Sequence, residues 1–418
     1  MEIKEIKAIR VFDSRGIPTI KTFVYTKNAV GYAIVPSGTS SGENEALELR
    51  DVKKKAYNNQ DVSIAIKNVN TIINRRLKNE FVLDQKNIDS ILIDLDGTNN
   101  KSKLGANAIL SVSLAVARAA ANEFEMSLYD YIARLNNNSK FSFPIPELNI
   151  INGGLHSGSN ISFQEFQIIP KFKSFEKTMQ ASTEIYFTLK EILNKKFGPS
   201  STNVGYEGGF VPNINNPLQE QQLELIQEAI DKNKYTKEVS LGLDCAANSF
   251  YDLKSKKYFV DNKHLDSNKL LDYYLDLIKR YNITSIEDPF FENDKKAWSL
   301  FYKKVNSKIS LIGDDLLVTN PKLIKDAIKK KYCNSLLLKP NQIGTLSETI
   351  ESFNLAKKAN WKVVVSHRSG ETEDPFIADL AYGLNSDFVK FGAPARSERT
   401  VKYNRILEIE NKIKKEIS

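Results

Sequence analysis

The chain has 418 residues, of which 41% are hydrophobic and 26% are charged, proportions typical of a soluble globular protein with about two domains. The chain has no apolar run of eighteen residues, which argues against a membrane-spanning protein. Its two cysteines are too few for a disulfide framework, and its start is unlike a secretory signal. These features predict a cytoplasmic protein. The formal net charge of +8 could serve nucleic-acid binding, but the lysines occur in short runs without interleaved aromatic residues, so we expect a solvated surface and no dedicated nucleic-acid or membrane site.

Residues 1–138 are predicted to form a small N-terminal α+β domain. Three segments with strand character come first, at residues 6–12, 19–25 and 31–35, and Gly16 gives the turn between the first two its backbone freedom. The hydroxyl-rich loop at residues 36–42 is long enough to act as a lid over a site, although most such loops are plain connectors.

Helical patterns follow this loop, from Ala46 to about Leu92. The segment from Gly105 to Phe124 is rich in alanine and apolar on nearly all sides, which predicts a buried helix. Residues 136–139 and two prolines soon after them interrupt the pattern. We therefore place the domain boundary there, with the second domain at residues 139–418.

The second domain repeats a strand followed by a helix about every 25 residues, which is the length of one βα unit. Each of these strands ends on a charged or titratable side chain, three acidic and then three basic: Asp244, Glu287, Asp314, Lys339, His367 and Lys390. Successive βα units close into a barrel, and the carboxyl ends of its strands share the face that holds the active site. One such residue could cap a helix, but six at the same structural position predict a polar cluster.

Lys339 directly follows three leucines, which are typical of a strand buried on both faces. An ammonium group at this place needs partners, and burial readily lowers its pKa. For this stretch alone, a lysine that extends its head to the surface is the simpler interpretation. The same pattern on the neighbouring strands favours a buried base.

The predicted cluster has a consistent chemistry. Asp244, Glu287 and Asp314 are hard oxygen ligands, which suit magnesium, whereas three carboxylates without a cation would raise each other's pKa. Lys339 is a candidate base. The cationic and hydroxyl groups for a phosphate or carboxylate come from His367, Arg368, Ser369 and Lys390. Together these groups predict proton abstraction next to a carboxylate, with the metal stabilising the enolate charge.

These residues lie in motifs that resemble the enolase family over essentially the full length of the chain. The matching motifs are at residues 13–16, 36–42, 45–51, 104–108, 152–156, 164–166, 207–210, 313–316 and 366–374. The resemblance implies an N-terminal α+β domain on a modified TIM-like βα barrel, one of whose early strands runs antiparallel. It also implies reversible dehydration of 2-phosphoglycerate to phosphoenolpyruvate in glycolysis and gluconeogenesis by a magnesium-dependent hydro-lyase, a carbon–oxygen lyase. A lysine or histidine base with one or two magnesium ions is general for this superfamily.

The resemblance also implies the catalytic roles. Lys339 takes the proton next to the substrate carboxylate. Glu207, with Glu165 beside it, is the general acid for the departing hydroxyl, and it must keep its proton at neutral pH, which requires a raised pKa. His367 is grouped with these catalytic residues.

The binding roles follow in the same way. Asp244, Glu287 and Asp314 hold the first Mg²⁺, and Ser40, on the mobile loop, brings in a second Mg²⁺ with the phosphate. Arg368 and Ser369 bind the phosphate, Lys390 pairs with the carboxylate, and His156, Gln164 and Glu165 line the substrate site.

Two features depart from the family pattern. Tyr206 precedes the proposed acid, where the family usually has an aspartate. In the family, a glutamate on the second strand pairs across a dimer interface with an arginine near the C-terminus. Here Lys21 and Glu408 occupy the matching positions, with both signs reversed. This exchange predicts a retained homodimer contact, whereas two unrelated surface charges are the alternative.

Two other functions stay open at this point. The chain could act on a different carboxylate as another member of the superfamily, although the phosphate motif at residues 366–369 argues against that. It could also be a catalytically impaired enolase-like protein with a binding or structural role. Formation of phosphoenolpyruvate from 2-phosphoglycerate, with and without magnesium, distinguishes these alternatives.

Overall fold

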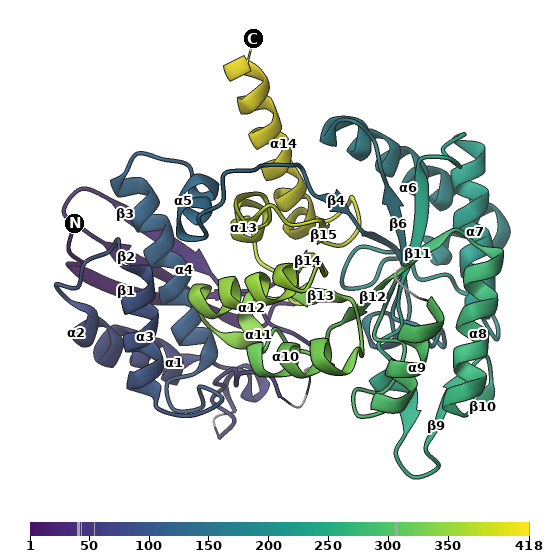
Figure 1. Cartoon of the computed structure of the whole chain (residues 1–418), viewed down its shortest axis with the longest axis horizontal. Helices are drawn as coiled ribbons and strands as arrows, with labels where there is room; N and C mark the ends of the chain where they lie inside the picture. Colours follow the sequence, from purple (N-terminus) through teal and green to yellow (C-terminus); the bar gives the residue numbers. More distant parts are fainter. Residues whose placement is uncertain (40–41, 43, 54, 306–307, 418) are drawn as a thin grey trace.

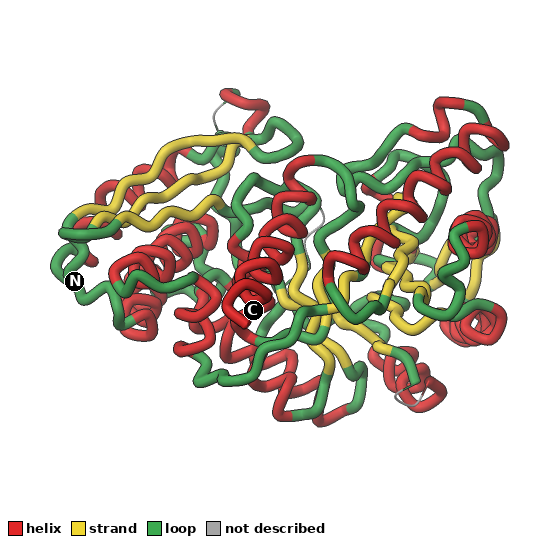
Figure 2. The backbone as a smooth tube through the Cα atoms, turned by 90° about the horizontal axis from the view of Figure 1, so that it is seen from above, coloured by secondary structure: helices red, strands yellow, loops and turns green. Residues whose placement is uncertain are grey.

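The computed structural model describes residues 1–39, 42, 44–53, 55–305 and 308–417. A three-stranded sheet with its helices forms one end of the molecule, and a barrel surrounded by helices forms the other (Figure 1). Figure 2 shows the long strands of the N-terminal sheet well apart from the shorter strands of the barrel. This is the predicted α/β architecture, a small α+β domain followed by a modified TIM-like barrel.

The N-terminal sheet is antiparallel in the order β1 (Glu5–Phe12), β2 (Pro18–Tyr25) and β3 (Val30–Ile34). These strands lie within one residue of the predicted segments at each end. Asp13 holds the first turn, because its carboxylate accepts the backbone N–H groups of Arg15 and Ile17. Gly16 has a φ of +74° in this turn, a conformation that favours glycine.

Helices cover this sheet: α1 (Ser63–Asn68), α2 (Asn74–Leu77), α3 (Gln85–Asp96), α4 (Ala106–Glu123) and α5 (Leu128–Leu135). The predicted helix at residues 105–124 is α4, and it is buried on nearly all sides. Gly31 of β3 lies so close to it that a Cβ would be 2.1 Å from the backbone nitrogen of Ala119. Small residues on both elements therefore allow the sheet and α4 to pack in direct contact.

The helix expected from Ala46 onward begins much later, at Ser63. Residues 46–53 and 55–62 form loops and a short 3₁₀ turn instead. Their backbone groups bond to distant segments: the N–H of Ala46 donates to Gln342 O and that of Leu47 to Asn100 O. Tertiary contacts have replaced the local bonds that a helix would need, so the prediction for this segment is wrong.

The barrel is one nine-stranded sheet in the order β4-β15-β14-β13-β12-β11-β7-β6-β5. Its strands are β4 (Ile145–Pro146), β5 (Leu148–Asn152), β6 (Glu165–Pro170), β7 (Val239–Asp244), β11 (Ile283–Glu287), β12 (Ser310–Gly313), β13 (Ser335–Leu338), β14 (Lys362–Ser366) and β15 (Phe388–Lys390). The two ends of this order, β4 and β5, are separated in the chain by the single residue Glu147, so the sheet closes on itself. β6 runs antiparallel to both of its neighbours, as expected for one early strand, and the other pairs are parallel.

Helices surround the barrel and connect its strands: α6 (Phe175–Phe197), α7 (Gln219–Lys232), α8 (Ser267–Arg280), α9 (Lys295–Val305), α10 (Pro321–Lys330), α11 (Pro340–Ile343), α12 (Leu346–Lys358), α13 (Phe376–Leu384) and α14 (Ser397–Ile417). A small antiparallel sheet, β8 (Tyr251–Asp252), β9 (Lys257–Val260) and β10 (Lys263–Leu265), lies between β7 and α8 in the chain. Among the described residues, no helix has both the length and the apolar character needed to cross a bilayer.

The N-terminal domain packs against the carboxyl-end face of the barrel. Ser37, in the loop after β3, forms a β-bridge with Gly370, which follows β14. Asp374 accepts the backbone N–H of Ile34 at 2.8 Å and pairs with Arg118 of α4 at 2.7 Å. These contacts bring residues 36–39, the described start of the hydroxyl-rich loop, to the mouth of the barrel.

Candidate active site

The predicted site residues converge at the carboxyl ends of the barrel strands. The described site residues other than Glu287 all line one pocket, and Gly38 and Ser366 line it with them. Glu287 lies directly beneath it and touches its lining through Lys390. The strand ends converge because parallel strands in a barrel point their carboxyl ends to one face.

Three carboxylates surround the ammonium group of Lys390, which ends β15. Its Nζ lies 2.8 Å from Asp244 Oδ2, 2.8 Å from Glu287 Oε2 and 3.1 Å from Glu165 Oε1. Burial opposes the ammonium charge, but these carboxylates raise the pKa of Lys390 well above its ordinary value. Lys390 is therefore a permanent positive charge in the floor of the pocket.

Lys339, directly after β13, is paired with a carboxylate of the neighbouring strand. Its Nζ lies 2.6 Å from Asp314 Oδ2. Burial alone would lower the pKa of Lys339, but the charge of Asp314 outweighs burial and raises it. The expectation of a lowered pKa is wrong for this arrangement of charges. In this arrangement Lys339 therefore keeps its proton at neutral pH.

The carboxylates of Asp244, Glu287 and Asp314 fit a magnesium site by their chemistry. Burial, and next the charge of Asp244, raise the pKa of Glu287 well above its ordinary value, and a divalent cation would relieve this crowding. In the described part of the chain, the groups whose ligand atoms already lie within 4.8 Å of one another are two different sets: His156, Glu165 and Glu207, and Asp288, Asp314 and Asp315. The three predicted metal ligands are paired with ammonium groups in this structure. Asp314 pairs with Lys339, and Asp244 and Glu287 pair with Lys390.

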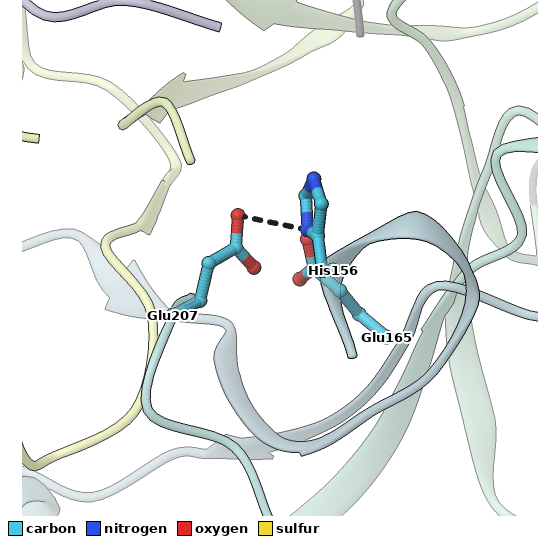
Figure 3. Close-up of side chains that lie close together, drawn as sticks. All are labelled: His156, Glu165 and Glu207. Carbon is cyan, nitrogen blue, oxygen red and sulfur yellow. Dashed lines mark ion pairs between the residues drawn. The ribbon is translucent and has the colours of Figure 1, made fainter. Parts of the chain in front are cut away.

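A second acidic group lies on the side of β6, where Glu165, Glu207 and His156 point toward one another (Figure 3). Glu207 Oε1 is 3.3 Å from His156 Nδ1, and Glu207 Oε2 accepts a hydrogen bond from Asn149. Burial and the charge of Glu207 raise the pKa of Glu165 well above its ordinary value. Burial would also raise the pKa of Glu207, but its contact with His156 outweighs burial and lowers it. The expectation of a raised pKa at Glu207 is wrong, and Glu165 keeps the proton of the pair.

His367 faces the same carboxylate from β14, with its Nε2 3.4 Å from Glu207 Oε1. Its side chain is buried, and burial lowers its pKa well below the ordinary range. His367 is therefore neutral at physiological pH, and the prediction of a cationic group at this position is wrong.

The phosphate motif meets the N-terminal domain. Arg368 Nη1 lies 3.0 Å from Glu45 Oε2, and Ser369 Oγ accepts the backbone N–H of Thr39 at 2.8 Å. The N-terminal domain thus closes this side of the pocket. Ser40, the next residue along and the predicted ligand of a second magnesium, lies outside the described residues.

Two polar residues at this site, Asp288 and Glu45, have contacts that were not predicted from the sequence. Asp288 accepts the backbone N–H groups of Asp314 at 2.9 Å and Asp315 at 2.8 Å and so holds the turn after β12. Its only signal in the sequence is its place directly after Glu287. Glu45 begins the motif at residues 45–51, but its contact with Arg368 was not predicted, because only the packing of the two domains brings the two side chains together.

Comparison with known proteins agrees with this geometry. A family model described as "Enolase, C-terminal TIM barrel domain" matches residues 140–418, and one described as "Enolase, N-terminal domain" matches residues 3–132. The chain belongs to the enolase family. It is 47% identical to "Enolase B" of Dictyostelium discoideum over 99% of this chain and 96% of that protein. It is 45% identical to "Enolase 1" of Entamoeba histolytica over 99% of this chain and 97% of that protein.

Membership of the enolase family over the full length determines the reaction. The chain is a phosphopyruvate hydratase, a hydro-lyase that dehydrates 2-phosphoglycerate to phosphoenolpyruvate in glycolysis. Enolases depend on magnesium in general, and the acidic groups of this pocket could bind it. The alternative of a non-catalytic binding protein has no support from these comparisons.

Proposed function

We propose that Lys339 is the base and the Glu165–Glu207 pair the acid of this dehydration, acting from opposite sides of the substrate. The observation that carries the proposal is their placement in the barrel. Around the closed sheet, β12, β11 and β7 lie on one side between β13, which precedes Lys339, and β6, which begins with Glu165, and β14, β15, β4 and β5 lie on the other side. A substrate bound between them has its α-carbon hydrogen near the lysine and its departing hydroxyl near the carboxyl pair.

The acid step uses the proton that Glu165 holds. Its raised pKa keeps one proton in the carboxyl pair at neutral pH, and donation to the hydroxyl lets that group leave as water. Glu207 shares this proton and is oriented by His156 and Asn149. His367, neutral and beside Glu207, is proposed to act with the pair.

The anionic groups of the substrate have cationic partners in the same pocket. Arg368 and Ser369 bind the phosphate and Lys390 pairs with the carboxylate, while His156 and Gln164 line the space between them. Arg368 exchanges its contact with Glu45 for the phosphate when substrate enters. These roles keep the substrate in one orientation relative to the base.

Asp244, Glu287 and Asp314 would hold one magnesium ion, and Ser40 with the substrate phosphate a second. Bound magnesium supplies positive charge that stabilises the developing enolate oxygens and lowers the proton affinity of the nearby ammonium group. With magnesium held there, Asp314 would no longer serve as the counter-ion of Lys339. We therefore expect turnover to depend on magnesium, and we propose two ions in each active site.

Absorbance of phosphoenolpyruvate tests the proposed reaction directly. Purified protein with 2-phosphoglycerate and magnesium is expected to form phosphoenolpyruvate, and chelation of magnesium is expected to stop it. A folded, magnesium-loaded protein that binds 2-phosphoglycerate without turnover would indicate the binding role instead. Turnover of only a different carboxylate would place it elsewhere in the superfamily.

We also propose a cytoplasmic homodimer held in part by Lys21 and Glu408. Lys21 Nζ lies over the ring of Tyr32 at 4.6 Å, and Glu408, with a 65% exposed side chain, pairs only with Arg405 of its own helix among the described residues. Lys21→Glu is expected to weaken the dimer by like-charge repulsion, and adding Glu408→Lys to restore it. Sedimentation equilibrium measures both effects, and a double variant as weak as the single one argues against the contact.

Tyr206 is expected to affect the pH dependence of turnover. Its side chain is 42% exposed and its ring lies 6.3 Å from that of His156, beside Glu207. Tyr206→Asp adds a negative charge there, which raises the pKa of the carboxyl pair. Because the acid must be protonated, the alkaline limb of kcat should move to higher pH by about one unit or less. An unmoved limb with altered thermal stability would make Tyr206 a packing residue only.

A further inference from the structure

Arg399, in the first turn of α14, is a fully buried cation that contacts the active-site loops from behind. Its guanidinium donates to the backbone oxygens of Arg368 at 2.6 Å, Ser369 at 2.7 Å and Tyr206 at 2.9 Å. It therefore joins the loop that carries the phosphate ligands to the loop that carries Glu207. None of the roles proposed above uses this residue.

The same guanidinium also contacts a catalytic side chain. Arg399 Nη1 lies 2.8 Å from His367 Nδ1, which is hydrogen-bonding distance. Gly392 leaves the room for this contact, since a Cβ at that position would lie 2.9 Å from Arg399 Cδ and 3.1 Å from His367 Cε1. The contact is thus built into the packing behind the pocket.

The chemistry of the two groups determines where the ring proton lies. A guanidinium has only donors and stays protonated in proteins, so His367 Nδ1 has to accept the hydrogen bond. The single proton of the neutral ring must then be on Nε2. That nitrogen lies 3.4 Å from Glu207 Oε1 and has no other hydrogen-bond partner among the described residues, so its N–H is placed next to the carboxylate of the acid pair.

We propose that Arg399 is a positioning residue that holds His367 in the neutral Nε2–H tautomer, so that His367 presents a donor to Glu207. This rests on the proposed function of the pocket, but the tautomer can be measured without turnover. The charged groups around His367 are Glu207, Arg399, Lys390 and Lys339. Of these, Arg399 alone bonds Nδ1 among the described residues.

Nitrogen-15 NMR of histidine-labelled protein tests the proposal, because the two ring nitrogens report which one carries the proton. The chain has only three histidines, and replacing His156 and His264 in turn assigns the signals. In the unmodified protein without substrate, His367 is expected to show the Nε2–H tautomer throughout neutral pH. A proton on Nδ1, or a doubly protonated ring, would overturn the proposal without any variant.

Arg399→Met removes every donor at similar length, and His367 is expected to populate the Nδ1–H tautomer or to titrate. The expected loss in kcat is about 10- to 100-fold, as for other residues that orient a functional histidine, with a new acid limb in its pH profile. Arg399→Lys keeps a donor and is expected to keep the Nε2–H tautomer. An unchanged His367 spectrum in Arg399→Met would show that Arg399 only connects the two loops and does not set the tautomer of His367.

Lys402→Met is the matched control. Lys402 lies one turn further along α14 and is equally buried. It donates to the backbone oxygens of Thr372 and Glu398 and pairs with Glu371 Oε2 at 2.7 Å, without touching His367. Its replacement is expected to lower stability but to leave the His367 tautomer unchanged. If Arg399→Met does not fold, the His367 spectra of the unmodified protein and of Arg399→Lys decide whether His367 carries its proton on Nε2. A protein that shows the predicted tautomer but no turnover of 2-phosphoglycerate contradicts the proposed function and leaves this inference intact.

Discussion

Lys339→Ala is expected to abolish turnover of 2-phosphoglycerate while substrate and magnesium still bind. Loss of a general base costs a factor of about 100 to 10,000, and more where no water can take its place. Lys339 is 11% exposed at its side chain and contacts Asp314, so little water can substitute for it. The loss should appear in kcat, because the groups proposed to bind phosphate and carboxylate are unchanged.

Exchange of the α-proton of 2-phosphoglycerate with solvent isolates this step. Deuterium incorporation, followed by NMR, should stop in Lys339→Ala together with turnover. Lys357→Ala is a suitable control, since Lys357 also pairs with an aspartate at 2.8 Å but lies outside the pocket. It should retain both exchange and turnover. Continued α-proton exchange in Lys339→Ala would mean that another group is the base.

Asp374→Asn is expected to cause the largest loss of stability. Asp374 is buried, accepts the backbone N–H of Ile34, and pairs with Arg118 across the two domains. The isosteric change leaves the buried guanidinium of Arg118 without its counter-charge. Breaking a buried pair in this way costs about 3–5 kcal/mol in the free energy of unfolding. Urea denaturation measures this value.

The pH dependence of that loss has a definite sign. Burial would raise the pKa of Asp374, but Arg118 outweighs burial and lowers it. A lowered pKa contributes stability above the unfolded value of about 4, and this contribution disappears as the pH falls through the folded value. The difference in stability between the two proteins should therefore be full at neutral pH and shrink in acid.

An exposed pair provides the comparison for Asp374→Asn. Asp326 pairs with Lys330 at 3.0 Å on the surface of α10, and both side chains are about half exposed. Asp326→Asn should cost less than about 1 kcal/mol, because solvent screens the pair. Equal losses in the two variants would show that the pair between the domains is no stronger than a surface contact.

The strands and the face on which they end were predictable because they depend on local patterns. Apolar runs of strand length, each followed by a charged residue, recur at the spacing of a βα unit from β7 to β15. The closed barrel then brings those strand ends together, as expected. The segment at residues 46–62 was predicted wrongly, because its backbone bonds to Gln342 and other distant groups that no local pattern reveals.

The sequence by itself determined which residues belong to this site and the family to which the chain is similar. Only the tertiary structure decided the charge state of each group, because a pKa depends on distances between residues far apart in the chain. Asp314 outweighs burial and raises the pKa of Lys339, burial lowers the pKa of His367, and of the two carboxyl groups it is Glu165 and not Glu207 whose pKa is raised. The contact of Arg399 with His367 is of the same kind, since α14 must fold against the barrel before the two side chains meet.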